Sequence, residues 1–158
     1  MLVYRIVHQK YAGDLYAGGR SGRFNSEGKK VIYTTGSISL AMLENLVHRN
    51  GAGFNADFRT MVIYIPDNLD IDTINKSVIP AGWNVDHDYS LTQPLGDKWF
   101  DKAKTPVLKV PSAVVPQEYN YILNTLHADF KHIKLIDTLA FFADRRIDDI
   151  IQKYGGKK

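Results

Sequence analysis

Short apolar runs rich in β-branched and aromatic residues recur along the chain and predict six β-strands. The first run carries one arginine, Arg5, among apolar neighbours. The run that begins at Met61 is stopped by Pro66, Asp67 and Asn68, a combination typical of a turn. The predicted strands cover residues 2–7, 30–34, 61–65, 107–110, 119–123 and 132–136.

The strongest helical pattern is Ile38–His48, where Gly36 and Ser37 supply an N-cap signal. Apolar side chains cover most of its circumference, which predicts a buried helix. A second helix is predicted at residues 144–154, with Asp144 as its cap and Gly155 as its stop. Residues 80–105 show no clean period, and only a short helix around residues 96–102 is predicted there.

No repeat or linker interrupts these elements, and 158 residues with 44% hydrophobic side chains suffice for one continuous core. We therefore expect a single α+β domain over residues 1–158. The chain has no cysteine, which excludes disulfides and thiolate metal sites. It shows no signal-peptide pattern and no apolar run near the roughly 18 residues that span a bilayer, so a cytoplasmic protein without a membrane partner is expected.

The charge of the chain is only mildly basic. Its formal net charge is +3 and its pI is about 9.0, and the lysines and arginines are scattered instead of forming a block. Direct nucleic-acid binding is therefore not indicated. Two explanations of the excess stay open: a solvated surface without a partner, or one or two arginines that hold a small anionic ligand.

Glu44 is the one carboxylate of the predicted helix Ile38–His48. Its neighbours one turn away are three apolar residues and a histidine, so no lysine or arginine of the helix can pair with it. Burial of an unpaired carboxylate costs free energy, and proteins keep such a group mostly where it has a function. Three interpretations stay open: a structural salt bridge to Arg5 or Arg23, a wet helix edge, or a functional carboxylate.

A glycine-rich stretch at residues 16–23 would let the backbone approach a ligand closely. Arg23 follows Gly22 at its end, and its guanidinium fork suits a phosphate or pyrophosphate. Arg5, alone in its apolar strand, can instead extend its charged end to the surface. The glycine spacing is not a dinucleotide fingerprint, because no helix follows directly and no acidic residue stands at the expected distance.

Metal and hydrolase signals are weak. The five histidines show neither HxxxH nor HxH spacing, so a zinc site is not expected, and the Asp86–His87–Asp88 stretch is interpreted as a polar loop. Ser112 lacks the glycines of a hydrolase nucleophile elbow and has the pattern of a turn residue. The residues alone therefore predict an arginine-plus-glutamate pocket for an anionic ligand and no particular reaction.

The same residues resemble the RES domain family, named for arginine, glutamate and serine, whose members are toxins of RES–Xre type II toxin–antitoxin systems. The resemblance runs along nearly the whole chain. In the first half it rests on YRI at Tyr4, GRFN at Gly22, VIY at Val31, and LAMLE at Leu40 with Val47 and His48. In the second half it rests on PAGW at Pro80, GDKW at Gly96, VPSAVVP at Val110, NY at Asn120 and DRR at Asp144.

This resemblance implies a fold like that of ADP-ribosyltransferases, with mixed β-sheets flanked by helices, and consumption of NAD as a substrate without another cofactor. It implies that Glu44 faces the nicotinamide ribose and stabilises oxocarbenium character as the ribose–nicotinamide bond breaks. The catalytic residues it implies are Glu44, Arg23 and Ser112. The NAD-binding residues it implies are Arg5 and Arg23 on the pyrophosphate, Tyr33 on the nicotinamide or ribose, Ser112 on the ribose or on Glu44, and Gly22 and Asn25 beside them.

The resemblance also implies a partner, an Xre-like helix-turn-helix antitoxin that blocks the pocket and carries the DNA contacts. Three functions stay open within this frame: an NAD glycohydrolase or phosphorylase, a mono-ADP-ribosyltransferase that modifies a cellular protein, and a non-catalytic corepressor of the antitoxin. The sequence does not decide among water, phosphate and a protein as the ADP-ribose acceptor. It also leaves homo-oligomerisation open.

Overall fold

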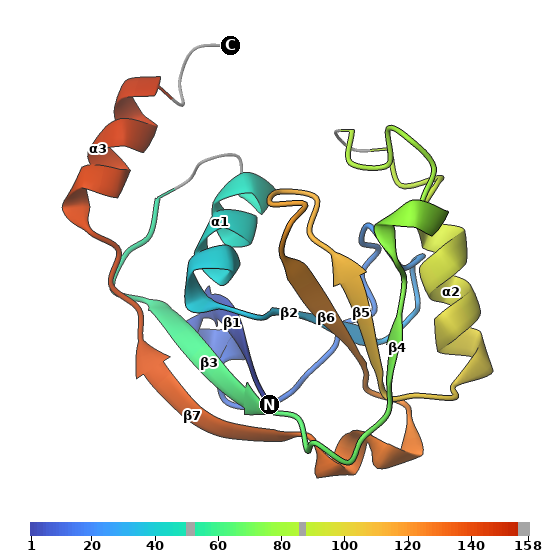
Figure 1. The fold of residues 1–158 in the computed structure, drawn as a ribbon. Coiled ribbons are helices and arrows are strands. Elements are labelled where there is room, and N and C mark those ends of the chain that lie inside the picture. The colour runs from blue at the N-terminus through green and yellow to red at the C-terminus, as the bar shows by residue number, and fades with distance from the viewer. Residues whose placement is uncertain (50–52, 86–87, 155–158) are drawn as a thin grey trace.

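A computed structural model describes residues 1–49, 53–85 and 88–154 (Figure 1). The strands are β1 (Leu2–His8), β2 (Val31–Thr35), β3 (Phe58–Tyr64), β4 (Ile71–Thr73), β5 (Val107–Pro111), β6 (Tyr119–Asn124) and β7 (Lys134–Ala140). The α-helices are α1 (Ile38–His48), α2 (Gln93–Lys102) and α3 (Arg145–Tyr154). Short 3-10 helices lie at η1 (Gln9–Tyr11), η2 (Lys76–Val78) and η3 (Ala128–His132).

The strands form one mixed sheet in the order β4-β5-β6-β2-β1-β3-β7. Strands β4 and β5 are parallel, and the other neighbours are antiparallel. The pairing of β1 with β2 is confined to Tyr4 and Thr35, whereas β1 pairs with β3 from end to end. The sheet therefore splays at its middle, with β1, β3 and β7 on one side and β4, β5 and β6 on the other (Figure 1). The predicted α+β class with a mixed sheet is confirmed.

Helices α1 and α2 pack on the same face of this sheet. Ala41 of α1 packs in one cluster with Ile6, and Trp99 of α2 packs in another with Ile122. Directly paired residues share a sheet face, and the pairing of Tyr4 with Thr35 and of Thr35 with Asn120 links these two regions. The opposite face carries the largest core cluster, which joins β1 and β3 to β2, β5 and β6. None of the described helices is long and apolar enough to cross a membrane.

Several predicted boundaries need correction. The strand predicted at residues 132–136 is wrong at its start, because η3 continues to His132 and β7 runs from Lys134 to Ala140. Most of β7 is exposed at the sheet edge, so it carries little apolar alternation. Strand β4 was not predicted, and two of its three residues are polar. Helix α2 begins at Gln93 instead of residue 96, with Pro94 in its first turn, where proline is tolerated.

The prediction of a buried helix over Ile38–His48 holds for one side only. Leu40, Ala41 and Leu46 are buried, but Leu43 and Val47 are 37% and 58% exposed. The helix covers the sheet with one face, and its apolar residues extend past the contact. The cap predicted at Asp144 is confirmed by its bond from the Arg146 amide. Asp86, His87 and Gly155 lie outside the described residues.

Candidate active site

Glu44 stands in the second turn of α1 and is half-buried. Its Oε1 atom accepts two hydrogen bonds, from Ser112 Oγ at 2.7 Å and from Asn120 Nδ2 at 2.6 Å. Among the described residues, no ion pair joins Glu44 to Arg5 or Arg23, so the structural salt bridge considered from the sequence is not formed. Nor does any described residue donate to Oε2. One oxygen is thus held by two donors, and the other accepts no hydrogen bond from a described residue.

Ser112 is fully buried, with 0% of its surface exposed, in the loop between β5 and β6. Its hydroxyl oxygen accepts hydrogen bonds from the amides of Val114 and Val115, each at 3.0 Å. The hydroxyl therefore has its proton directed to Glu44 and its lone pairs directed to the loop. The resemblance implied that Ser112 contacts the ribose or Glu44, and its hydroxyl donates to Glu44 in the structure.

Asn120, at the start of β6, is the second donor to Glu44 and was not predicted as a site residue. It pairs across the sheet with Thr35 and Val110, which fixes its backbone. Its Oδ1 atom is buried and has no hydrogen-bond partner among the described residues. The sequence signals were its place among the residues that carry the family resemblance and its polar side chain at the start of an apolar strand.

A second group of predicted residues forms the turn that precedes β2. Gly22 and Asn25 pair as an isolated bridge. The Tyr33 hydroxyl accepts from the Phe24 amide at 2.9 Å and donates to Asn25 Oδ1 at 2.8 Å. Burial raises the pKa of Tyr33 well above its ordinary value, so the phenol stays protonated. A Cβ at Gly22 would lie 2.7 Å from Asn25 Oδ1 and 2.9 Å from the Tyr33 hydroxyl, so this turn requires glycine.

Helix α2 also holds this turn through hydrogen bonds from Gln93. Gln93 Nε2 donates to the carbonyls of Gly22 at 3.0 Å and Asn25 at 3.1 Å. A Cβ at Gly96 would lie 1.8 Å from the carbonyl oxygen of Phe24, which explains a glycine inside a helix. Gly22 and Asn25 thus shape the backbone that presents Arg23.

Arg23 projects from this turn toward the loop before α2. Its Nη1 atom donates to the carbonyls of Trp83 at 2.5 Å and Val85 at 3.4 Å, and its guanidinium lies 4.8 Å from the centre of the Tyr89 ring. Among the described residues, no carboxylate lies within ion-pair distance of Arg23. Its hydrogen-bond partners are backbone carbonyls, and Tyr89 is a neighbour that sequence reasoning missed. The exposed carboxylate of Asp88 also interacts with the Arg23 charge, although the pKa of Asp88 is lowered chiefly by its hydrogen bonds from Ser90.

Arg5 is placed apart from Glu44. Tyr4 and Ile6 pack with α1, while Val3 and Val7 belong to the core on the opposite face. Strand alternation therefore directs Arg5 away from α1. Desolvation lowers the pKa of Arg5, and no described residue forms a hydrogen bond or ion pair with its guanidinium.

The structure thus brings the predicted residues together in two groups on one sheet face, with Arg5 outside both. Glu44 and Ser112 form the first group, and Arg23, Gly22, Asn25 and Tyr33 form the second. Tyr33 lies on the same face of β2 as Thr35, whose partner Asn120 binds Glu44. The described residues contain no group of three or more histidine, aspartate or glutamate side chains that would hold a metal ion.

Comparison with solved structures places this fold in a known class. The chain matches the crystal structure of the M. tuberculosis MbcT–MbcA toxin–antitoxin complex with a TM-score of 0.69 and 16% identity, over 99% of this chain and 89% of that one. The two chains therefore share one fold over nearly their whole length.

Sequence comparison gives the family. The RES domain model matches residues 2–144, so the chain belongs to the RES domain family. It is 36% identical to "Toxin Res" of Photorhabdus laumondii over 152 residues, covering 93% of this chain and 97% of the relative. It is 30% identical to "Prs ADP-ribosylating toxin" of a Sphingobium species over 141 residues, covering 86% of this chain and 88% of the relative.

Proposed function

We propose that this chain is an NAD-cleaving toxin of a toxin–antitoxin system, with Glu44 at the scissile nicotinamide–ribose bond. The observation that carries the proposal is the fixed carboxylate: Ser112 and Asn120 hold Oε1 of Glu44, and no described residue donates to Oε2. Support for NAD use comes from the RES family and from a relative named an ADP-ribosylating toxin. The names of two other relatives, "Toxin Res", support the toxin role.

The chemistry asked of Glu44 is electrostatic. When the bond between ribose C1′ and the nicotinamide nitrogen breaks, its electron pair leaves with nicotinamide and positive charge develops on the ribose ring. A carboxylate whose position is already fixed stabilises that charge without reorganising. Ser112 and Asn120 set the orientation of Glu44, so they act through it as positioning residues.

Arg23 is the cation that we assign to the pyrophosphate. Its guanidinium is anchored to the carbonyls of Trp83 and Val85, and its charge interacts with the exposed carboxylate of Asp88 beyond ion-pair distance. An anionic pyrophosphate would pair with this fixed guanidinium more closely than Asp88 does. Tyr33, Gly22 and Asn25 would support this role by shaping the turn around Arg23. The assignment of Arg5 to the pyrophosphate stays a prediction, and strand alternation directs Arg5 away from α1 and Glu44.

Water, phosphate or a protein side chain would complete the reaction by attacking the same ribose carbon. We propose a glycohydrolase or phosphorylase first. Transfer of ADP-ribose to a protein is the second candidate, favoured by the name of the Sphingobium relative. The match to a toxin–antitoxin complex supports a cognate antitoxin, which we propose to be of the Xre-like helix-turn-helix class. A corepressor without catalysis is the remaining alternative.

Expression of Glu44→Gln in cells tests the proposal sharply. Glutamine has the shape of glutamate, and its amide oxygen can accept from Ser112 and Asn120 in place of Oε1, so the fold should be kept while the charge is lost. The matched control is Glu27→Gln, because Glu27 is exposed and binds only the Ser21 amide. The wild type and the control should deplete cellular NAD and arrest growth, and Glu44→Gln should do neither.

Three other outcomes would redirect the assignment. Growth arrest with unchanged NAD and a discrete protein labelled from NAD would favour transfer to a protein. Arrest and NAD loss that persist in Glu44→Gln would contradict the role of Glu44. Repression together with the antitoxin, without toxicity or NAD turnover under any condition, would favour the corepressor.

A further inference from the structure

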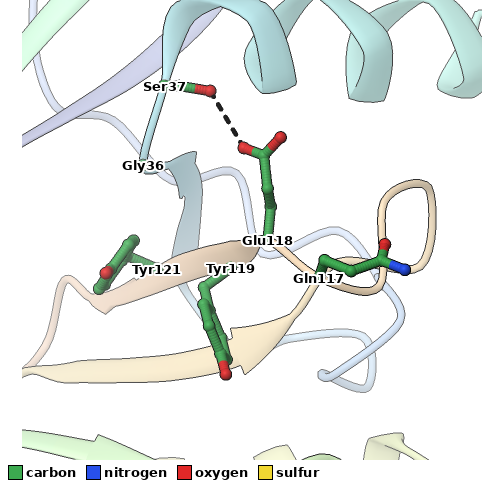
Figure 2. A pocket seen from close by; sticks show the side chains of 6 residues that line it. All are labelled: Gly36, Ser37, Gln117, Glu118, Tyr119 and Tyr121. Carbon is green, nitrogen blue, oxygen red and sulfur yellow. Dashed lines mark hydrogen bonds between the residues drawn. The ribbon is translucent and has the colours of Figure 1, made fainter.

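The chain contains three glutamates, and Glu118 is the last residue of the loop between β5 and β6 that carries Ser112. Its carboxylate Oε2 accepts a hydrogen bond from Ser37 Oγ at 3.2 Å, and its backbone carbonyl accepts from the Ser112 amide at 2.9 Å. Figure 2 shows the Glu118 side chain extending from the start of β6 to Ser37 at the start of α1. These residues line part of a pocket of about 240 Å³ that does not include Glu44.

Ser37 serves two partners at once. Its hydroxyl accepts from the Leu40 amide at 3.1 Å, which caps α1, and donates to Glu118. The negative charge of Glu118 also lies at the positive end of the helix dipole, where carboxylates are stabilising. Glu118 therefore ties the beginning of α1 to the loop that carries Ser112.

This link completes a closed set of contacts. Glu118 holds the start of α1 through its side chain and holds Ser112 through its backbone. About two turns beyond Ser37 on the same helix, Glu44 meets the Ser112 hydroxyl. A shift of the helix start would move Glu44 relative to both of its donors.

We propose that Glu118 is a positioning residue that fixes α1 against the Ser112 loop and so keeps Glu44 in its reactive orientation. The proposal rests on the proposed NAD cleavage for its catalytic meaning. Its structural part, the tie between Glu118 and Ser37, stands apart from the reaction.

Steady-state NAD cleavage by the purified protein tests the catalytic part. Glu118→Ala should lower kcat roughly tenfold and leave KM nearly unchanged, because misplacement of a catalytic group acts on the chemical step. Glu118→Gln should retain most of the activity, since its amide oxygen still accepts from Ser37. In a Ser37→Ala background, Glu118→Ala should have little further effect. Glu27→Ala is the control and should match the wild type.

Amide hydrogen exchange tests the structural part without NAD. Glu118→Ala should speed exchange in the first turns of α1, between Leu40 and Glu44, and Glu27→Ala should not. Wild-type kcat and wild-type exchange in Glu118→Ala would overturn the proposal. So would fully additive losses in the double variant. If the wild type cleaves no NAD, the proposed function fails, and hydrogen exchange alone then tests the contact between Glu118 and Ser37. Faster exchange in Glu118→Ala would support that contact as a structural link, and unchanged exchange would refute it.

Discussion

Ser112→Ala should separate the two roles of the buried serine, because one hydroxyl serves three partners. The substitution removes the acceptor of the Val114 and Val115 amides and one donor to Glu44. A buried amide without a partner costs about 1–3 kcal/mol. Both valines are half-buried, so water can replace part of each bond and the lower end applies. We expect a loss of about 2–3 kcal/mol in the free energy of unfolding, or roughly 5–10 °C in Tm for a domain of this size.

Asn120→Ala is the matched comparison. Asn120 makes one bond to Glu44, and its Oδ1 has no partner among the described residues, so its loss should cost only about 1 kcal/mol. Denaturant unfolding with an unchanged m-value measures both losses. NAD cleavage should fall about tenfold in each variant, because each frees Oε1 of Glu44 from one donor. Two results would contradict these expectations: a Ser112→Ala protein as stable as the wild type, or an Asn120→Ala protein less stable than Ser112→Ala.

Three further predictions test the supporting structure. Gly96→Ala should destabilise the protein by at least about 2 kcal/mol, because the added Cβ would lie 1.8 Å from the Phe24 carbonyl oxygen. Gly13→Ala is the control, since a Cβ at Gly13 would meet no atom within 4 Å, and its thermal melt should match that of the wild type. Tyr33→Phe should cost about 1–3 kcal/mol through the lost bonds to Phe24 and Asn25. Burial raises the pKa of Tyr33 in the folded state above its ordinary value of 10.0. The stability that the protonated phenol contributes is therefore fully present below pH 10 and is lost as the pH rises above 10, where the unfolded state releases the proton first. The wild type should accordingly lose more stability than Tyr33→Phe between pH 9 and about 11. Arg5→Met should raise Tm, since it removes a desolvated charge that has no partner among the described residues. If Arg5 contacts the pyrophosphate, the substitution should also raise KM for NAD severalfold. An unchanged KM would remove Arg5 from the site.

Periodicity predicted the elements whose residues face a core. Helix α1 was predicted with its observed bounds, because its cap at Ser37 and its apolar residues coincide. Strand β4 and the far end of β7 escaped prediction, since their pairing is set by neighbours along the sheet and not by their own apolar pattern. The exposed apolar residues of α1 belong to the same periodic pattern as its buried ones, because periodicity marks an apolar surface whether or not another element covers it.

The candidate site was partly readable for a similar reason. Glu44 was conspicuous because no cation on its own helix pairs with it, and the resemblance added Ser112, whose contact with Glu44 the structure then showed. Asn120 lies 76 residues from Glu44 in the chain, and only the sheet register brings them together. Arg5 was grouped with Glu44 by the resemblance, whereas strand alternation directs it to the other face.

The central claim is that Glu44 supports cleavage of the nicotinamide–ribose bond of NAD. The most direct measurement is the release of free nicotinamide from NAD by the purified protein, with and without phosphate. Wild type and Glu44→Gln are compared after a thermal melt has shown that the two proteins have the same Tm. We expect nicotinamide and a ribose product from the wild type, with phosphate incorporated if phosphate is the acceptor. In Glu44→Gln the release of nicotinamide should fall at least about 100-fold. Equal release by both proteins, or none by the wild type with NAD and each candidate acceptor present, would contradict it.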